Sequence, residues 1–417
     1  MTTPTLDSTF TLPSGQVLKN RIGKSAMSEA LATTDNVPTE LLSTLYRRWA
    51  EGGIGLCLTG NVMIDKNALG EPNNVVLEND LHLDKFKAWA KAGVHNGTQL
   101  WMQLNHPGKQ CPKGLNRETV SPSAVPWEEK MQSFFELPRE LAEDEIQDII
   151  HRFAKSASLA KEAGFTGVQI HGAHGYLVSQ FLSPHLNRRT DQWGGTPENR
   201  MRFVKEVYRS IRTAVGSDFP IGIKMNSADF QKGGFSEEES LNVMKVLSGL
   251  GIDLIEISGG TYEAPAMSGN EKFEDSYQKD STKKREAYFL RFAEKVRNEV
   301  SAPLMVTGGF RSGVGMSAAL ETSALDIVGI ARPVAIDPEF PNKVLNDINT
   351  ESPVKLVRTG IKMIDQMSLM DVAWYTRQLK RIGKGLEPAI NENPTIALIK
   401  IMISTGFRTF QTKRLRA

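Results

Sequence analysis

The stretch EDEIQDIIHRFAKSASLAKEAGFTGVQIHGA (143–173) joins a helical pattern to a short apolar run. Its first part, 143–164, opens with acidic residues and ends at a glycine, as capping physics favours for a helix. The run GVQIHGA (167–173) is continuously apolar before it ends in small and polar residues. Such runs are typical of parallel strands that are covered by helices. The stretch therefore predicts a helix followed by a strand of an α/β fold.

Comparable apolar runs recur along the whole chain. They are RIGKSAM (21–27), IGLCLTG (54–60), QLWMQLN (99–105), PIGIKMN (220–226), DLIEISG (253–259), PLMVTGG (303–309) and DIVGIAR (326–332). Helical patterns lie between them, for example at 38–52, 197–216 and 236–251. Eight βα units with right-handed crossovers close naturally into a (β/α)8 barrel. The alternative is an open doubly wound sheet, which we disfavour because no strand runs directly into a GxGxxG turn and a helix.

The βα pattern stops near residue 345, so we expect two parts. Residues 1–345 would form the (β/α)8 (TIM) barrel, and residues 346–417 a C-terminal helical extension packed on the barrel or on a neighbour. A chain of 417 residues is long for one domain, but barrels of this kind can exceed 400 residues.

Composition narrows the class of protein further. Hydrophobic residues make up 40% of the chain and charged residues 24%, which is typical of a globular protein. The formal net charge is only +2, so the sequence does not indicate nucleic acid as a partner. Cys57 and Cys111 are the only cysteines, which excludes an iron–sulfur cluster, a Cys-rich zinc site and a disulfide framework. Without an apolar leader or span, we expect a soluble cytoplasmic protein.

The polar residues at the strand ends carry the chemical information, because barrel enzymes place their active sites at the C-terminal face. His171 and His174 follow one strand where the chain turns, so their N–H groups could hold one substrate oxygen as negative charge develops on it. Tyr176 could supply a proton from the same rim. Structural histidines are the first alternative and zinc the second. The carboxylates of Asp191 and Glu198 lie well beyond the strand end, so we expect no metal.

The segment HGAHGYLVSQFLSPHLNRRTDQWGGTPENR (171–200) closely resembles the signature of the old yellow enzyme family of NAD(P)H:flavin oxidoreductases. The similarity runs from about Leu18 to Pro341 and includes LKNRI, SAMS, MQLNHPG, TGG and GIAR. It implies a (β/α)8 barrel with bound FMN and an ene-reductase reaction. NADH or NADPH would reduce FMN, and reduced FMN would reduce an alkene activated by a carbonyl or nitro group in a ping-pong cycle. The resemblance places the substrate among His171, His174 and Tyr176.

The same resemblance implies a cofactor site around the rim. Barrels commonly bind phosphate at the loops after strands seven and eight, which here begin at Gly308-Gly309 and Ala331-Arg332. Lys224 and Gln103 match the positions that serve the N1 and O2 edge of the flavin, and an unpaired buried lysine would be hard to explain by packing. Gln103 could alternatively be a satisfied core amide. The residues that match positions lining the flavin ring are Ser25, Ala26, Met27, Ser28 and Asn61.

Two loops are expected to set substrate choice, and two departures bear on the pocket. The loop 106–138 brings Trp127, and the loop 258–282 brings Tyr262, a candidate substrate-binding residue. Some relatives have cysteine where this chain has Ser28 and tyrosine where it has Ala30, so this side of the pocket should be more open.

Three other functions compete with the ene-reductase. They are an FMN-dependent dehydrogenase or NADH oxidase, a metal-dependent barrel hydrolase or aldolase, and a flavin-binding protein without turnover.

The C-terminal tail contains apolar residues interleaved with basic residues. The sequence IALIKIMI (396–403) is followed by several cations, and the basic residues of the tail are Lys400, Arg408, Lys413, Arg414 and Arg416. A basic amphipathic helix could lie on an anionic membrane. We favour a terminal helix docked on the barrel or across a subunit interface, and we expect a homo-oligomer.

Overall fold

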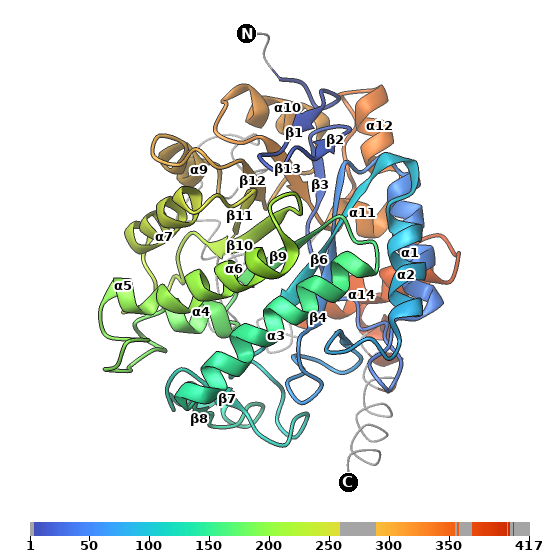
Figure 1. Cartoon of the computed structure of the whole chain (residues 1–417). Coiled ribbons are helices and arrows are strands. Elements are labelled where there is room, and N and C mark those ends of the chain that lie inside the picture. The colour runs from blue at the N-terminus through green and yellow to red at the C-terminus, as the bar shows by residue number, and fades with distance from the viewer. Residues whose placement is uncertain are drawn as a thin grey trace.

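The computed structural model describes residues 4–258 and 289–354, Val357, and residues 369–397, 399, 400 and 403. Eight parallel strands form a closed barrel (Figure 1), because the last strand pairs with the first. They are β3 (Ile22–Lys24), β4 (Leu56–Met63), β6 (Gln99–Asn105), β9 (Gly167–Gly172), β10 (Ile221–Asn226), β11 (Leu254–Ser258), β12 (Leu304–Thr307) and β13 (Ile327–Ile330). The predicted (β/α)8 barrel is confirmed. Strand β4 extends beyond its predicted end and also pairs with β5 (Val75–Val76).

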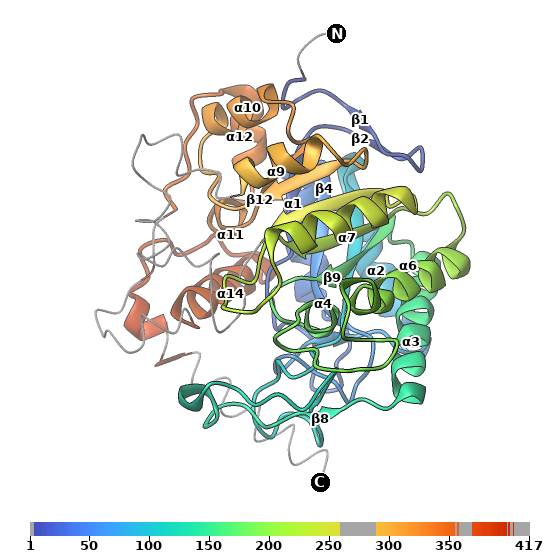
Figure 2. The ribbon, with the colours of Figure 1, turned by 90° about the vertical axis from the view of Figure 1, so that its left-hand side faces the viewer.

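Helices surround the barrel in both views (Figures 1 and 2). They are α1 (Glu40–Glu51), α2 (Leu83–Gly93), α3 (Glu143–Glu162), α4 (Leu177–Leu182), α5 (Pro197–Arg200), α6 (Arg202–Val215), α7 (Glu237–Gly249), α9 (Leu290–Arg297), α10 (Gly313–Glu321), α11 (Arg332–Ile336), α12 (Phe340–Asn346) and α14 (Leu369–Gly383). Short 3-10 turns lie at η1 (His95–Gly97) and η2 (Glu129–Met131). The four predicted helical stretches are confirmed. Helix α7 begins with a capping box, in which Ser236 accepts from the Glu239 N–H.

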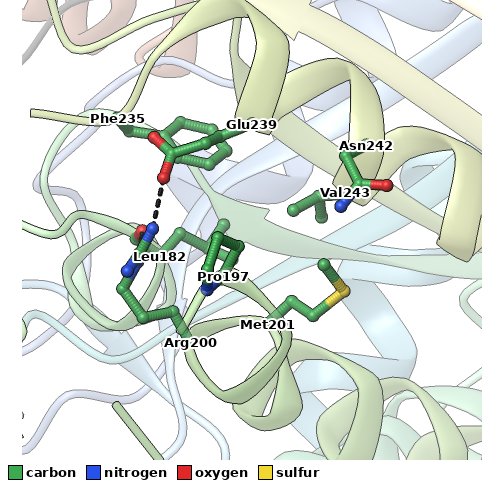
Figure 3. Close-up of a pocket in the computed structure, with 8 residues that line it drawn as sticks. All are labelled: Leu182, Pro197, Arg200, Met201, Phe235, Glu239, Asn242 and Val243. Atoms are coloured by element: carbon green, nitrogen blue, oxygen red, sulfur yellow. Dashed lines mark hydrogen bonds and ion pairs between the residues drawn. The ribbon is translucent and has the colours of Figure 1, made fainter. Parts of the chain in front are cut away.

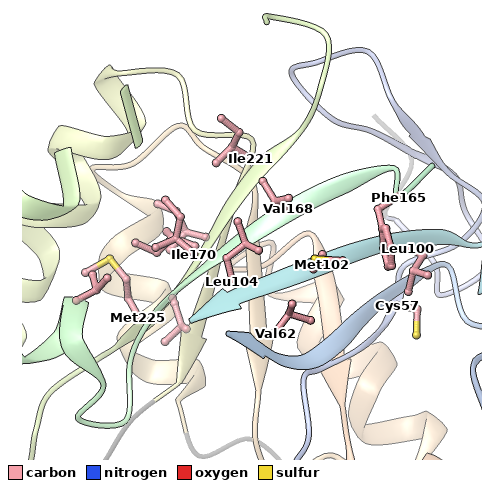
Figure 4. Close-up of a cluster of buried hydrophobic side chains, with 14 of the residues drawn as sticks. Cys57, Val62, Leu100, Met102, Leu104, Phe165, Val168, Ile170, Ile221 and Met225 are labelled. Atoms are coloured by element: carbon pink, nitrogen blue, oxygen red, sulfur yellow. The ribbon is translucent and has the colours of Figure 1, made fainter. Parts of the chain in front are cut away.

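Outward-facing strand residues pack against the helices. Figure 4 shows this layer, with Met102 and Leu104 of β6 beside Val168 and Ile170 of β9. Because strand side chains alternate between faces, the residues between them point into the barrel. Cys57 also lies in the outer layer, and its burial raises the pKa of the thiol to about 12. Both cysteines are free and buried, which agrees with reduced structural thiols.

The inward-facing residues form an apolar plug at the N-terminal end of the barrel. A hairpin of β1 (Phe10–Thr11) and β2 (Val17–Leu18) covers this end. The plug consists of Leu12, Leu18, Leu56, Leu58, Trp101, Leu254, Met305 and Ile327. Two residues further along several strands, the interior becomes polar, as Trp101 is followed by Gln103 and Leu254 by Glu256. The barrel is therefore closed by apolar packing at one end and lined with hydrogen-bonding groups toward the other.

Two further segments bear on the C-terminal face. The loop after β6 contains β7 (Val120–Ser121) and β8 (Arg139–Glu140), which pair with each other. Helix α14 packs near α1, and its Thr376 Oγ1 donates to the Ser28 carbonyl at 3.1 Å. Within the described part of the chain, no helix is both long and apolar enough to cross a membrane.

Candidate active site

His171 and His174 lie together at the end of β9. Their ring centroids are 5.2 Å apart, with an interplanar angle of 80°. His174 has a φ of 60°, a left-handed conformation that is uncommon for a residue with a side chain. Its N–H donates to Asn226 Oδ1 at 3.0 Å, which helps to hold this turn. The turn brings the second imidazole back toward the first, as the sequence predicted.

The hydrogen bonds assign the ring nitrogens only in part. The Ala173 N–H donates to His171 Nδ1 at 3.3 Å, so a neutral His171 carries its proton on Nε2. His174 Nε2 lies 2.8 Å from Ser258 Oγ, at the end of β11. His171 therefore has an Nε2–H that can donate to a ligand. In His174, the Nε2 atom is hydrogen-bonded to the Ser258 hydroxyl.

Both histidines are neutral groups at ordinary pH. Burial lowers the pKa of His171 well below its usual value, and the nearby His174 and Lys224 lower it further. Burial, with the Lys224 charge, lowers the pKa of His174 to about 3. Neutral imidazoles can donate to an oxygen that gains negative charge, but they are poor acids.

Tyr176 stands next to the histidine pair. Its ring contacts that of His171 at a centroid distance of 4.6 Å, and it is the residue before α4. Asn61 Nδ2 lies 3.4 Å from the Tyr176 hydroxyl. The phenol therefore belongs to the same cluster as the two imidazoles, and Asn61 connects it to β4.

Lys224 is buried and paired with a carboxylate. Its Nζ lies 3.1 Å from Glu256 Oε1 and donates to Ser25 Oγ at 2.8 Å. The argument from sequence that packing could hardly explain this lysine assumed an unpaired ammonium, and that assumption is wrong. Gln103 also takes part in an internal hydrogen bond, since its Nε2 donates to Gln169 Oε1 at 2.7 Å. Both residues face the barrel interior: Lys224 is the register partner of His171, and Gln103 is the register partner of Gln169, two residues before His171 on β9.

The loop after β12 begins with two glycines in unusual backbone conformations, and the loop after β13 leads directly into α11. Gly308 and Gly309 have φ angles of 143° and 88°, which a residue with a side chain rarely adopts. Ala331 directly precedes α11, and Arg332 is its first residue. The Arg332 guanidinium lies 5.7 Å from the centre of the Tyr375 ring on α14. The C-terminal helix thus reaches the same edge of the rim.

The segment after β3 combines interior and surface contacts. Ser25 faces the polar layer, Ala26 packs against the apolar plug, and Met27 packs against the outer core. The Ser28 hydroxyl donates to the Glu71 carboxylate, and burial raises the pKa of Glu71. A carboxylate therefore lies beside Ser28, on the side of the pocket that the sequence predicts to be more open.

Several residues at the site were missed in the sequence. They are Glu256, Gln169, Ser258, Asn226, Asn105 and Glu71. Glu256 could have been found from the sequence, because it is a carboxylate inside the apolar run LIEIS, just as Lys224 is a cation inside IGIKMN. Side chains alternate between the two faces of a strand, so both charged residues could point into the barrel. Asn105 is 1% exposed and neither of its amide atoms has a hydrogen-bond partner among the described residues. A buried polar atom without a hydrogen-bond partner is a candidate for contact with a bound ligand.

The loop after β6 presents an aromatic cluster, whereas the second specificity loop is not described. Trp127 stacks on Phe135 at a centroid distance of 4.3 Å, and the Lys109 ammonium lies 4.2 Å from the Trp127 ring. Tyr262 falls outside the described residues. A small pocket elsewhere, between α5 and α7, is lined by the Arg200–Glu239 ion pair and has room for no more than about one water molecule (Figure 3). It lies away from the histidine pair and is not the site.

The residues at the rim fit a flavin mononucleotide. The turn at Gly308 and Gly309 is of the kind whose backbone N–H groups would hold a phosphate, and Arg332 adds a cation at that edge. Asn61 Oδ1 is buried and has no partner among the described residues, as expected for an acceptor that a polar ring edge would satisfy. No three His, Cys, Asp or Glu side chains of the described ranges gather as metal ligands would. The fold and the site together define a flavin-dependent barrel oxidoreductase.

Comparison with known proteins agrees with this class. The NADH:flavin oxidoreductase / NADH oxidase family matches residues 10–351, and the chain belongs to this family. The NADH-dependent flavin oxidoreductase iccE of Talaromyces variabilis is 36% identical over 91% of this chain and 98% of its own length. The NADH-dependent flavin oxidoreductase iliE of Neonectria sp. is 39% identical over 82% of this chain, which spans only 47% of that longer protein.

A solved structure supports the same conclusion for the fold. The old yellow enzyme homologue from Zymomonas mobilis superposes with a TM-score of 0.70 at 24% identity, over 84% of this chain and 95% of that one. The resemblance to the old yellow enzyme family is thereby confirmed. The protein is an NAD(P)H:flavin oxidoreductase that uses FMN and a nicotinamide reductant.

Proposed function

We propose that this enzyme is an ene-reductase, which reduces a C=C bond conjugated to a carbonyl or nitro group. The observation that carries the proposal is the cluster of His171, His174 and Tyr176, which places neutral N–H donors beside a phenol. An oxidase that passes its electrons to oxygen would need no such arrangement for an organic oxyanion. When bound, FMN supplies a carrier that takes hydride from NAD(P)H and gives it to the β-carbon of the alkene.

The protein side chains divide the remaining work. The His171 Nε2–H donates to the carbonyl or nitro oxygen, and His174 adds a second N–H from Nδ1 when its Nε2 accepts from Ser258 Oγ. These donors stabilise the negative charge that develops as the β-carbon is attacked. Tyr176 then protonates the α-carbon. Because the nicotinamide and the alkene occupy the same pocket in turn, the kinetics are ping-pong.

Tyr176→Phe tests this division of labour in rapid-mixing experiments under argon. Flavin reduction by NADH needs no phenolic proton, so its rate should stay within about threefold of the wild-type rate. Reoxidation by 2-cyclohexenone should slow by roughly 10²–10⁴, as expected for a lost general acid. Tyr208→Phe is the matched control, since the Tyr208 hydroxyl donates to the Leu250 carbonyl far from the rim.

Two outcomes would contradict the proposal. Equal slowing of both half-reactions in Tyr176→Phe would show that the tyrosine is structural. Wild-type enzyme that is reoxidised by oxygen, but by no enone or nitroalkene in a panel, would favour the NADH oxidase alternative. Placement in the cytoplasm remains a prediction from the sequence.

A further inference from the structure

Glu256 lies at the centre of the polar layer inside the barrel and is fully buried. Its Oε1 accepts from Ser25 Oγ at 2.5 Å and from Thr307 Oγ1 at 2.7 Å, and lies 3.1 Å from Lys224 Nζ. Its Oε2 accepts from Gln169 Nε2 at 2.7 Å. Four groups that can donate therefore surround one carboxyl group. A carboxylate, which only accepts hydrogen bonds, matches these four partners.

The Lys224–Glu256 pair changes what Lys224 can do electrostatically. The two residues are register partners on β10 and β11, and their side chains are 3% and 0% exposed. A buried ammonium alone would impose a full positive charge on its surroundings. An ammonium 3.1 Å from a carboxylate imposes mainly a dipole, because the two opposite charges largely cancel at a distance. Glu256 therefore weakens the positive field that Lys224 exerts on the site.

The same carboxylate also orients an amide relay. Because Glu256 only accepts, Gln169 must direct its NH2 group toward it and its carbonyl oxygen toward Gln103. Gln103 then donates through Nε2 to that oxygen at 2.7 Å. The direction of both amides is thus fixed by the charge at the end of the chain. Gln103 keeps its carbonyl oxygen and one N–H for another partner.

We propose that Glu256 sets the reduction potential of the bound FMN by opposing the charge of Lys224 and by fixing the orientation of Gln103. The inference rests on the family assignment and on the proposed placement of Lys224 and Gln103 at the flavin edge. Reduced flavin carries negative charge, which a nearby cation stabilises and a nearby anion destabilises. The pair therefore holds the potential below the value that Lys224 alone would give, so that the reduced cofactor is a stronger donor toward the alkene. Glu256 acts through its neighbours as a positioning residue.

A charge cycle in the FMN-loaded enzyme tests this inference. The variants are Glu256→Gln, Lys224→Met and the double variant, and the readout is the midpoint potential by equilibration with reference dyes. Glu256→Gln should favour flavin reduction by tenfold or more, a rise of about 30 mV per tenfold for two electrons. Lys224→Met should shift the equilibrium in the opposite direction by a similar factor. The double variant, with neither charge, should return to within a few-fold of the wild type.

The double variant keeps the test valid if Glu256→Gln alone does not fold, since it leaves no unpaired charge. Its potential should then lie at least about 30 mV above that of Lys224→Met, which is tenfold in the two-electron reduction equilibrium, and equal potentials would overturn the inference. Glu239→Gln is the matched control, because it removes the carboxylate of the remote Arg200–Glu239 pair. This control should leave the potential unchanged, whereas a shift of similar size would show that the effect is not local.

Two combined results separate this inference from the proposed function. If the potentials shift in opposite directions but no enone is reduced, the electrostatic role of Glu256 stands and the ene-reductase proposal fails. If enones are reduced normally and neither charge moves the potential, the role of Glu256 is refuted while the function stands.

Discussion

At the scale of single residues, burial controls the chemistry of the site. His171 and His174 match two positions expected to hold a substrate oxygen, and both are kept neutral by burial and by the positive Lys224 nearby. A neutral pair donates hydrogen bonds over the whole physiological pH range. Substrate binding through these donors should therefore show no loss as the pH rises through 6.5, the usual pKa of histidine.

The same depressed pKa values predict how stability depends on pH. Between about pH 6.5 and about 3, the unfolded chain binds a proton at His174 that the folded chain does not. Keeping the two histidines neutral therefore costs no stability above pH 6.5, and the cost grows as the pH falls below that value. Urea denaturation between pH 7 and pH 4.5 should show a shallower decline in unfolding free energy for His171→Asn/His174→Asn than for the wild type. The exposed His151→Asn serves as control, and an identical decline in the double variant would contradict the prediction.

At the scale of elements, helix α14 supports the rim from outside the barrel. Its Thr376 donates to the Ser28 carbonyl, and its Tyr375 ring lies near Arg332. Trp374 and Leu379 are buried on the same helix, at 4% and 0% exposure. The division into a barrel of residues 1–345 and an extension of residues 346–417 remains a proposal, but this helix of the second part contacts the site itself.

Leu379→Ala tests whether α14 docking supports the cofactor site. Removing this buried side chain should destabilise the docked helix by about 2–5 kcal/mol. We expect faster amide hydrogen exchange in α14 and weaker FMN retention, with little change in β9. Val372→Ala on the same helix, where the side chain is 48% exposed, should alter neither property. Unchanged exchange in α14 of Leu379→Ala would show that other contacts hold the helix.

At the scale of the whole molecule, apolar side chains exposed near the C-terminus are candidates for the subunit contact that the sequence led us to expect. Ile396, Ile399 and Ile403 are 49%, 51% and 66% exposed, and their spacing places them on one side of a helix. Lys400 on the same segment lies 3.4 Å from Glu392. An apolar side exposed in the single chain fits the expected subunit contact better than docking on the chain's own barrel. A membrane surface remains the alternative.

Analytical ultracentrifugation distinguishes these partners. If copies associate through this side, Ile399→Asp should lower the sedimentation coefficient toward that of a single chain while FMN content stays the same. Leu81→Asp, at another site where the side chain is 74% exposed, should leave the assembly intact. A wild-type chain that sediments alone and floats with anionic vesicles would instead identify the tail as a membrane contact.

The sequence by itself determined the strands, the barrel and the rim residues His171, His174 and Tyr176. Each of these depends on short-range patterns: continuous apolar runs, helix caps and a turn directly after a strand. The turn at Gly308 and Gly309, which we propose for the phosphate, was visible for the same reason, because positive φ angles are a local property of these glycines.

Only the tertiary structure decided which polar groups are paired. Ser25 and Glu256 are 231 residues apart in sequence, and Ser28 and Thr376 are 348 apart, yet both pairs share a hydrogen bond. Closing the barrel brings β3 and β11 to face one interior, and no local pattern encodes that distance. A cation inside the barrel could be predicted from the position of Lys224 in β10, but the pairing of that cation with Glu256 could not. An electrostatic field depends on every nearby charge, and those charges meet only when the chain is folded.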